Sequence, residues 1–225
     1  MRSLAFLNKK YQVDIRSDAD ESVLAEIFPL REYFVIEPVL KAAKTAVLDI
    51  GAHKGFFVLY ARALNAEVPI YAYEPEEENF RALKEHLELN KISHVSPKNS
   101  AVAKVGGTSV LHVSEDSHNH SLVVVPGTVK DRKVNAITLE RIVSKLEHVD
   151  LVKMDCEGAE FQILENAPDS VFEKCPAFFL ETHEYKEDMR AANLKTLFEK
   201  KGYSVKVYPS KYDKRFGFLW AQRKS

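Results

Sequence analysis

Two patterns of apolar residues alternate along most of the chain. Short, mostly apolar runs such as residues 46–50 and 69–75 are typical of strands that are buried on both faces. Each run is followed by a longer segment, residues 56–64 and 76–90, in which apolar side chains recur every three to four positions, as on one face of a helix. Strands and helices in alternation predict a parallel sheet with helices on both faces.

The same alternation resumes after residue 138. The expected elements are a helix, a strand, a helix, a strand, a long helix and two strands, over residues 139–146, 149–155, 157–167, 177–183, 187–201, 203–209 and 216–223. Only a short polar link separates the last two strands, which predicts an antiparallel pair at one edge of the sheet. Residues 96–103 add a short strand to the first half of the chain.

Two stretches do not fit this alternation. Residues 1–44 carry only short helix or strand pieces, and we interpret them as an N-terminal extension that could cap a crevice of the domain formed by residues 45–225. Residues 106–134 combine β-branched runs with glycine pairs and a polar link, a pattern that predicts hairpin-like strands. We expect this β insertion at the edge of the sheet or over the ligand crevice.

The overall composition narrows the classes of protein to consider. The chain has 225 residues, of which 45% are hydrophobic and 29% charged, values typical of one globular domain with a sizeable core. Its net charge of −1 gives no general attraction to nucleic acid or to anionic membranes. The two cysteines match no metal-binding spacing, and no apolar run approaches the ~18 residues of a membrane span. These features predict a reduced, cytoplasmic protein.

A glycine turn, VLDIGAHKGFF at residues 47–57, follows the first predicted strand. A dinucleotide fingerprint would need further glycines where this chain has histidine and phenylalanine, and a phosphate loop would need Gly-Lys-Ser/Thr. Asp49, Gly51 and Gly55 instead form the pattern Asp-x-Gly-x-x-x-Gly. This pattern resembles the first motif of class I S-adenosylmethionine-dependent methyltransferases, in which the turn approaches the amino-acid part of the cofactor.

Acidic side chains stand at the ends of several predicted strands. They are Asp49, Glu74, Asp155, Glu157 and Glu181, with His183 close to the last. Because the carboxyl ends of parallel strands share one edge of a sheet, we expect these groups to converge on one crevice. Desolvated carboxylates repel one another unless they meet donors or a cation, so the pattern predicts a positively charged ligand. Glu74 closes its strand, where nucleoside-binding folds place an acid on the ribose hydroxyls.

Lys153 and Asp155 lie two residues apart on a predicted central strand and therefore face the same side of it. Charged groups are rarely buried without partners, so the two bond either to each other or to a ligand. Glu157 and Glu160 begin the following helix, where acids stabilise the helix N-terminus without any ligand. The sequence leaves these alternatives open.

Several segments in order resemble the FkbM-type family of class I methyltransferases. Besides the glycine turn, they lie at residues 26–34, 71–83, 100–103, 149–164 and 178–183. The block Asp-x-Glu-Gly-x-Glu at 155–160 distinguishes this family from other class I enzymes, while His53 stands where many members have asparagine. The resemblance implies a doubly wound α/β fold, with a seven-stranded, mostly parallel sheet whose last strand is antiparallel.

The resemblance also implies a cofactor and a reaction. The cofactor is S-adenosylmethionine, and the reaction is methyl transfer to a hydroxyl oxygen of a sugar, a glycan or a natural product. The implied cofactor-binding residues are Asp49, Gly51, Ala52, His53, Gly55, Phe57, Glu74, Pro75, Asn79, Ser100, Ala101 and Asp155. An alcohol is a poor nucleophile at neutral pH, so a general base or a metal is needed. Our candidate base is Asp155, followed by Glu157 or His183.

A divalent cation is the alternative to a base. Asp155, Glu181 and His183 could share Mg²⁺, as carboxylates and imidazole do in catechol-type O-methyltransferases, and hard oxygen ligands suit this ion. We favour a site without metal, because a metal site requires these ligands to converge, which the sequence does not show. Activity that survives exhaustive EDTA treatment would remove the metal hypothesis.

Other functions receive less support from the sequence. Methylation of RNA or protein would need an extended basic surface or stacking aromatic residues, of which the basic, tyrosine-containing C-terminal segment is a weak indication. A non-catalytic binding domain with the same fold is disfavoured by the carboxylates, and a dehydrogenase by the missing glycines. His118 and His120 in the polar link are weaker candidates for substrate contacts. We expect a small-molecule or glycan acceptor, without nucleic acid or a membrane as partner.

Overall fold

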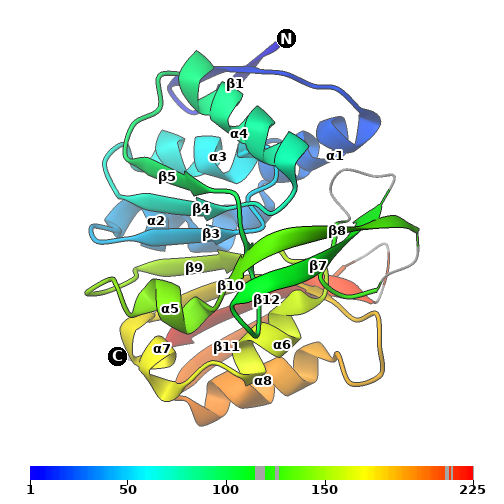
Figure 1. The fold of residues 1–225 in the computed structure, drawn as a ribbon. Coiled ribbons are helices and arrows are strands. Elements are labelled where there is room, and N and C mark those ends of the chain that lie inside the picture. The colour runs from blue at the N-terminus through cyan, green and yellow to red at the C-terminus, as the bar shows by residue number, and fades with distance from the viewer. Residues whose placement is uncertain (115–119, 125–126, 211–212, 214, 225) are drawn as a thin grey trace.

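A seven-stranded sheet forms the centre of the protein (Figure 1). The computed structural model describes residues 1–114, 120–124, 127–210, 213 and 215–224. From one edge to the other, the strands are β11 (Tyr203–Pro209), β12 (Phe216–Arg223), β10 (Ala177–His183), β9 (Leu151–Met154), β3 (Val47–Ile50), β4 (Ile70–Tyr73) and β5 (Val95–Lys98). Neighbouring strands are parallel except where β12 pairs with β10 and β11. The predicted mostly parallel α/β sheet with a reversed last strand is confirmed.

Helices cover both faces of this sheet (Figure 1). On one face lie α3 (Phe56–Leu64) and α4 (Glu77–Leu89); on the other lie α5 (Leu139–Val143), α6 (Ala159–Glu165), α7 (Asp169–Lys174) and α8 (Ala191–Lys200). Side chains alternate along β3, so that Leu48 and Ile50 join the core under α5 to α8, while Val47 joins the core under α3. Burial on both faces explains why the strands read as unbroken apolar runs.

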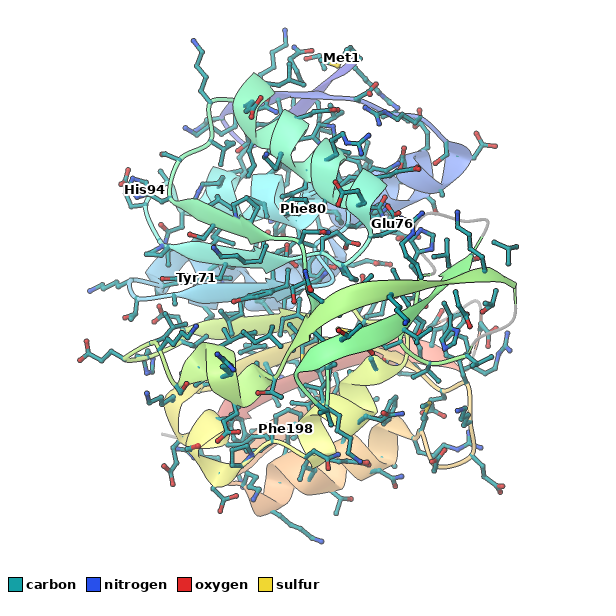
Figure 2. All side chains as sticks on the ribbon, in the orientation of Figure 1. Met1, Tyr71, Glu76, Phe80, His94 and Phe198 are labelled. Carbon is teal, nitrogen blue, oxygen red and sulfur yellow. The ribbon has the colours of Figure 1, made fainter. Side chains whose placement is uncertain are left out.

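Aromatic rings fill the core beneath α8. Phe198, labelled in Figure 2, is fully buried, and its ring centroid lies 5.0 Å from that of Phe178 and 5.3 Å from that of Tyr203. The Tyr203 hydroxyl donates to the Phe172 carbonyl at 2.6 Å, so the one polar atom of this group is satisfied. Burial of one such ring stabilises the fold by about 1.5–3 kcal/mol. This packing fixes β10, which carries Glu181 and His183 at its far end.

Helices α6 and α8 begin later than their apolar periodicity predicts. Glu157 (φ +51°) and Gly158 (φ +94°) adopt left-handed conformations, so α6 starts at Ala159. Arg190 is extended, so α8 starts at Ala191. The predicted strand over residues 96–103 is also divided, because β5 ends at Lys98 and residues 101–102 pair in another sheet. Periodicity finds the elements, but the termini are set by local backbone conformation.

The N-terminal segment packs on the α3 side of the sheet. It contains the hairpin β1 (Arg2–Phe6) and β2 (Lys9–Val13), helix α1 (Asp18–Ile27), the 3-10 helix η1 (Glu32–Ile36) and α2 (Glu37–Ala42). Ser17 caps α1 by accepting a hydrogen bond from the Asp20 backbone N–H. Phe6 stacks on Tyr60 of α3, with ring centroids 4.8 Å apart. The boundary of the main domain at residue 45 stays a prediction.

The β insertion forms a separate three-stranded sheet. Its strands are β6 (Ala101–Val102), β8 (Thr128–Ile137) and β7 (Gly107–Ser114), with β8 in the centre and antiparallel to β7. An ion pair between Arg132 of β8 and Glu76, which is labelled in Figure 2 at the start of α4, fixes it to the main domain. It does not extend the edge of the central sheet.

Among the described residues, no helix is long and apolar enough to cross a membrane.

Candidate active site

The turn between β3 and α3 packs so tightly against β9 that only glycine fits at its first position. A Cβ atom on Gly51 would lie 1.7 Å from the carbonyl oxygen of Asp155, and Gly51 has a left-handed φ of +75°. Gly55, with φ +82°, forms the N-cap of α3. His53 between them also has a positive φ of +48°, a conformation that costs about 1–2 kcal/mol when a Cβ is present. The turn and Asp155 therefore form one rigid unit.

Connected cavities open at the C-terminal ends of β3, β4, β9 and β10. The turn cavity holds about 660 Å³ of empty space beside the glycine turn, Glu74 and the insertion. The inner cavity, of about 570 Å³, lies beside Lys153, Asp155 and α1. The outer cavity, of about 1200 Å³, lies between α1 and the ends of β10 and β12. Glu157 lines all three cavities, so together they form one site.

Most of the predicted cofactor residues line the first two cavities. The turn cavity is lined by Gly51, His53, Glu74, Pro75, Asn79, Ala101 and Asp155, and the inner cavity by Ala52 and Phe57. Three of the predicted residues line neither cavity. Asp49 is fully buried below the turn, Gly55 starts α3, and the Ser100 hydroxyl lies 3.2 Å from the carbonyl oxygen of Asn135.

Glu74 is buried at the end of β4 and faces the turn cavity. Its two carboxyl oxygens accept hydrogen bonds from the backbone N–H groups of His53 and Glu76, each at 2.8 Å. Burial raises the pKa of Glu74 to about 8, although these two hydrogen bonds oppose the shift. Each oxygen keeps a further lone pair, so the group can still accept two hydroxyl donors from a ligand.

Asp49 and Lys153 form a buried ion pair that supports the turn from below. The register of β3 and β9 places the two residues side by side, and Lys153 Nζ lies 3.3 Å from Asp49 Oδ1. Lys153 also donates to the Gly51 carbonyl at 2.9 Å and lies 3.7 Å from Asp155 Oδ2. Burial raises the pKa of Asp49 to about 6, although Lys153 opposes this shift. Lys153 and Asp155 thus bond to each other, the first of the two sequence alternatives.

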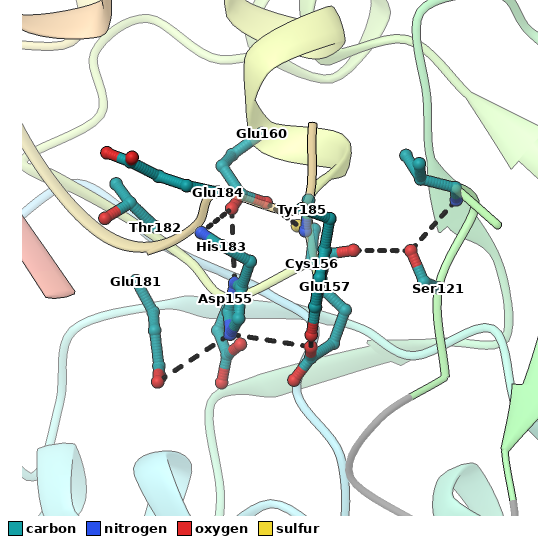
Figure 3. Close-up of polar contacts among 12 residues, drawn as sticks. Ser121, Asp155, Cys156, Glu157, Glu160, Glu181, Thr182, His183, Glu184 and Tyr185 are labelled. Carbon is teal, nitrogen blue, oxygen red and sulfur yellow. Dashed lines mark hydrogen bonds and ion pairs between the residues drawn. The ribbon is translucent and has the colours of Figure 1, made fainter. Parts of the chain in front are cut away.

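A second cluster surrounds His183 at the end of β10 (Figure 3). Glu160 is fully buried and accepts from the backbone N–H of His183 at 3.0 Å, while the ring Nδ1 lies 3.2 Å from the same oxygen. The other ring nitrogen faces Glu157 at 3.5 Å and Glu181 at 3.8 Å. Burial alone would lower the pKa of His183, but the three carboxylates raise it well above its ordinary value. The carboxylates therefore favour the protonated form of His183.

Glu157 is held from several sides. The Ser121 hydroxyl of the insertion donates to its backbone carbonyl at 2.5 Å, and the Tyr185 hydroxyl donates to its carboxylate at 2.7 Å. Burial raises the pKa of Glu157 to about 7, an effect that His183 opposes. The three predicted catalytic residues, Asp155, Glu157 and His183, thus lie in one site. A carboxyl group with this pKa can take up a proton near neutral pH.

The predicted metal ligands also converge, but they do not fit Mg²⁺ as they stand. One atom each from Asp155, Glu181 and His183 lies within 4.8 Å of the others. Both nitrogens of His183, however, already face carboxylates, and a protonated imidazole donates hydrogen bonds and does not ligate a cation. The arrangement fits an ion-paired cluster better than a magnesium site, and metal binding stays a prediction.

Sequence reasoning missed the residues that cover the site. Val23, Glu26 and Glu32 of the N-terminal segment line the inner cavity, and Leu111, His120 and Leu122 of the insertion line the turn cavity. The amphipathic pattern of α1 and the β-branched run of β7 are readable in the sequence, but neither shows where the segment docks. His120 was a weaker candidate and does line the site, whereas His118 lies outside the described residues.

The fold matches several solved methyltransferases. A methyltransferase FkbM from Methylobacillus flagellatus KT superposes with a TM-score of 0.53 at 17% identity; the match covers 79% of this chain but 43% of that protein. Magnesium protoporphyrin IX methyltransferase from Synechocystis PCC 6803, solved with bound SAH (S-adenosylhomocysteine), superposes with a TM-score of 0.54 at 10% identity, over 95% of this chain and 90% of that protein. The architecture is that of the class I methyltransferases.

Sequence comparison narrows this class to one family. The model of the methyltransferase FkbM domain matches residues 49–205, which is more than half of the chain. This chain belongs to the FkbM methyltransferase family, so the predicted resemblance is confirmed. Methyltransferase 1 from Beauveria bassiana (strain ARSEF 2860) is 25% identical over 183 residues, which cover 72% of this chain and 73% of that protein.

Proposed function

We propose that this protein is an S-adenosylmethionine-dependent methyltransferase that acts on a hydroxyl oxygen of a small molecule or glycan. One observation carries the proposal. Carboxylates from three strand ends, Glu74, Asp155 and Glu181, converge on connected cavities although they are far apart in the sequence. The cofactor carries an ammonium, a sulfonium and two ribose hydroxyls, and so it presents the charges and donors that such a site requires.

The residues of the turn cavity fit this cofactor. Glu74 has free lone pairs for the ribose hydroxyls, and Leu111 and Leu122 of the insertion offer apolar surface on which the adenine would pack. Gly51 lets the backbone of the turn approach the amino-acid end, beside Asp155. When bound, the cofactor supplies an electrophilic methyl group. The contribution of the chain is to hold that group and the acceptor oxygen in line and to exclude water.

Glu157 is our candidate for the general base. It lines the turn, inner and outer cavities, and its pKa of about 7 is close to the value that general-base catalysis favours. The sequence alone ranked Asp155 first, but Lys153 lies 3.7 Å from the Asp155 carboxylate. Tyr185 and His183 orient the Glu157 carboxylate toward the cavities. In this proposal Glu157 would accept the proton of the acceptor hydroxyl while the methyl group passes from the sulfonium sulfur, whose bond to it breaks, to the acceptor oxygen.

The lining of the cavities disfavours nucleic acid as the acceptor. The outer cavity exposes Glu26, Glu32, Glu157 and Glu181, which would repel a phosphate backbone. Methylation of RNA therefore lacks support from this site, and a small hydroxylated acceptor fits its size and charge better.

Isothermal titration calorimetry with S-adenosylhomocysteine tests the cofactor assignment. We expect micromolar binding to the wild type and, at pH 9 where Glu74 is ionised, at least about tenfold weaker binding to Glu74→Gln, because hydrogen bonds to a charged group contribute about 1.5–3 kcal/mol. Glu78→Gln is the matched control, since Glu78 lies exposed one turn away on α4. A wild-type protein that gives no heat at millimolar ligand would refute the proposal.

A further inference from the structure

The outer cavity is the part of the site that the cofactor's nucleoside does not need, and it is where an acceptor would enter. It shares Glu26, Glu32, Glu157 and Glu181 with the inner cavity, so a molecule in it reaches the candidate base. The part of it that a water molecule can reach, about 470 Å³, falls within the range of small-molecule binding sites. The side chains that line it therefore determine which acceptors can bind.

The register of the sheet explains why charged and aromatic side chains meet there. Glu181 pairs with Phe218 and His183 pairs with Phe216 across β10 and β12, and side chains paired in this way stand on the same face. Helix α1 and η1 cover this face and add Glu26 and Glu32. The wall of the outer cavity is thus built from separate elements and is not a run of acids on one surface helix.

The charges of this wall are not balanced among the described residues. Besides Glu26, the carboxylates of Glu32, Glu157 and Glu181 line the cavity, and His183 is the one basic group among the described residues that lines it with them. Glu32 has no hydrogen bond or ion pair with any other described residue. Burial raises the pKa of Glu32 to about 7, with Glu26 and Asp155 adding to the shift.

The nearest described cations are engaged elsewhere. Lys153 is held by Asp49 and by the Gly51 carbonyl. Arg215 binds Asp213 at 2.6 Å, and its guanidinium carbon lies 5.5 Å from the centroid of the Phe216 ring. Neither of them lines the outer cavity. The wall therefore favours a ligand that brings its own positive charge.

The aromatic rings give a second, independent indication. Tyr185 stacks on His183 with centroids 5.8 Å apart and meets Phe216 edge to face at 5.8 Å, so the rings of Tyr185 and Phe216 lie together beside the carboxylates. Aromatic faces bind organic cations and the C–H faces of sugars, whereas a hydrated metal ion gains little from them. An organic ammonium ion can pair with the carboxylates and can also pack against the aromatic rings.

We propose that the acceptor is a hydroxylated amine, whose ammonium group binds at Glu32 and Glu181 against the aromatic wall while its hydroxyl group faces Glu157. This inference rests on the proposed function and adds to it the charge of the acceptor. Acceptors in which the amine is neutralised, or replaced by a carboxylate or phosphate, would lose this contact.

Matched pairs of probes test the inference. The probes are amino sugars and amino alcohols, each compared with its N-acetylated counterpart, and binding to the complex of protein and S-adenosylhomocysteine is measured by ligand-observed NMR titration. Each pair keeps its hydroxyls and differs at the nitrogen, which loses its positive charge and gains an acetyl group. We expect the amines to bind at least about tenfold more tightly than their acetylated partners, the strength of one charge-assisted hydrogen bond.

Substitutions of the carboxylates test where the ammonium group binds. Glu32→Gln and Glu181→Gln should each reduce the preference for amines by about tenfold, whereas Glu147→Gln, the same charge change at an exposed position after α5, should leave it unchanged. Circular dichroism spectra that match the wild type show that these variants are folded, and each titration is made with S-adenosylhomocysteine at saturation.

The possible outcomes separate the two proposals. Equal affinity within the pairs, no binding by any amine at millimolar concentration, or a preference that survives both substitutions would overturn the amine inference. So would binding of Mg²⁺ at Glu181 that abolishes the preference, because the wall would then be a metal site. Failure of S-adenosylhomocysteine itself to bind would instead overturn the proposed function.

Discussion

At the scale of single residues, Glu157 combines a functional position with a strained backbone. Its φ of +51° is unusual for a residue with a side chain, and such conformations cost on the order of 1–3 kcal/mol. They persist only where the surroundings impose them. Here the following Gly158 is also left-handed, and Ser121 and Tyr185 hold the carbonyl and the carboxylate of Glu157. The insertion thus sets the position of the candidate base.

Substitution of Ser121 tests this role. Ser121→Ala removes the donor to the Glu157 carbonyl, and we expect kcat for methyl transfer to fall about ten- to a hundredfold, because small misplacements of catalytic groups have effects of this size. Transfer of tritium from labelled cofactor measures it. Ser109→Ala on β7 of the same sheet is the control. An unchanged kcat with an unchanged pH profile would show that Ser121 does not position the base.

At the scale of elements, one buried ion pair joins α1 to the glycine turn. Lys54 Nζ lies 2.5 Å from Asp20 Oδ1, and both side chains are buried. The Lys54 carbonyl in turn lies 2.7 Å from Nδ1 of His86 on α4, whose other ring nitrogen accepts from the Asp14 backbone N–H at 2.8 Å. These contacts explain how a helix outside the strand–helix alternation comes to cover the inner cavity.

Removal of one partner of this pair should be costly. Lys54→Met leaves Asp20 buried without its cation, and we expect the free energy of unfolding to fall by about 3–5 kcal/mol in urea denaturation. Lys195→Met, which breaks an exposed pair on α8, should change it by about 0.5 kcal/mol at most. Addition of Asp20→Asn to Lys54→Met should restore part of the loss, and a further decrease would contradict the assignment.

At the scale of the whole molecule, burial opposes the ionisation of several carboxyl groups in the site. Burial raises the pKa of Asp49, Glu32 and Glu74 together, the last to about 8. A carboxyl group whose pKa is higher in the folded state than in the unfolded state stabilises the fold at low pH, and this contribution is lost as the pH rises through the folded pKa. His183, whose pKa is also raised, acts in the same direction.

Stability should therefore fall as the pH rises from about 4.5 to about 8. For Glu74 the contribution is lost between its ordinary value of 4.5 and about 8. We expect the thermal midpoint of the protein without ligand to decline over this range, and to decline less in Glu74→Gln, which cannot ionise, than in Glu78→Gln. A midpoint that rises steadily across the same range would mean that Glu74 is ionised in the fold without penalty.

Much of the site can be predicted from the sequence because the patterns that indicate it are local. Apolar runs and helical periodicity locate β3, β4, β9 and β10, and the acids at their ends follow from the position of each strand terminus. Parallel strands share one edge, so the amino-acid sequence is enough to predict that Glu74, Asp155 and Glu181 converge. The family resemblance rests on these same segments.

The partners of each acid cannot be read in this way. Asp49 binds Lys153 because β3 and β9, a hundred residues apart, are neighbours in register, and the order of strands is a property of the whole sheet. The docking of α1 and of the insertion, which brings Glu32 and Ser121 to the site, likewise depends on long-range packing. The sequence by itself determined which chemical groups stand at the strand ends. Only the tertiary structure decided which of them are neutralised within the protein and which are left for a ligand.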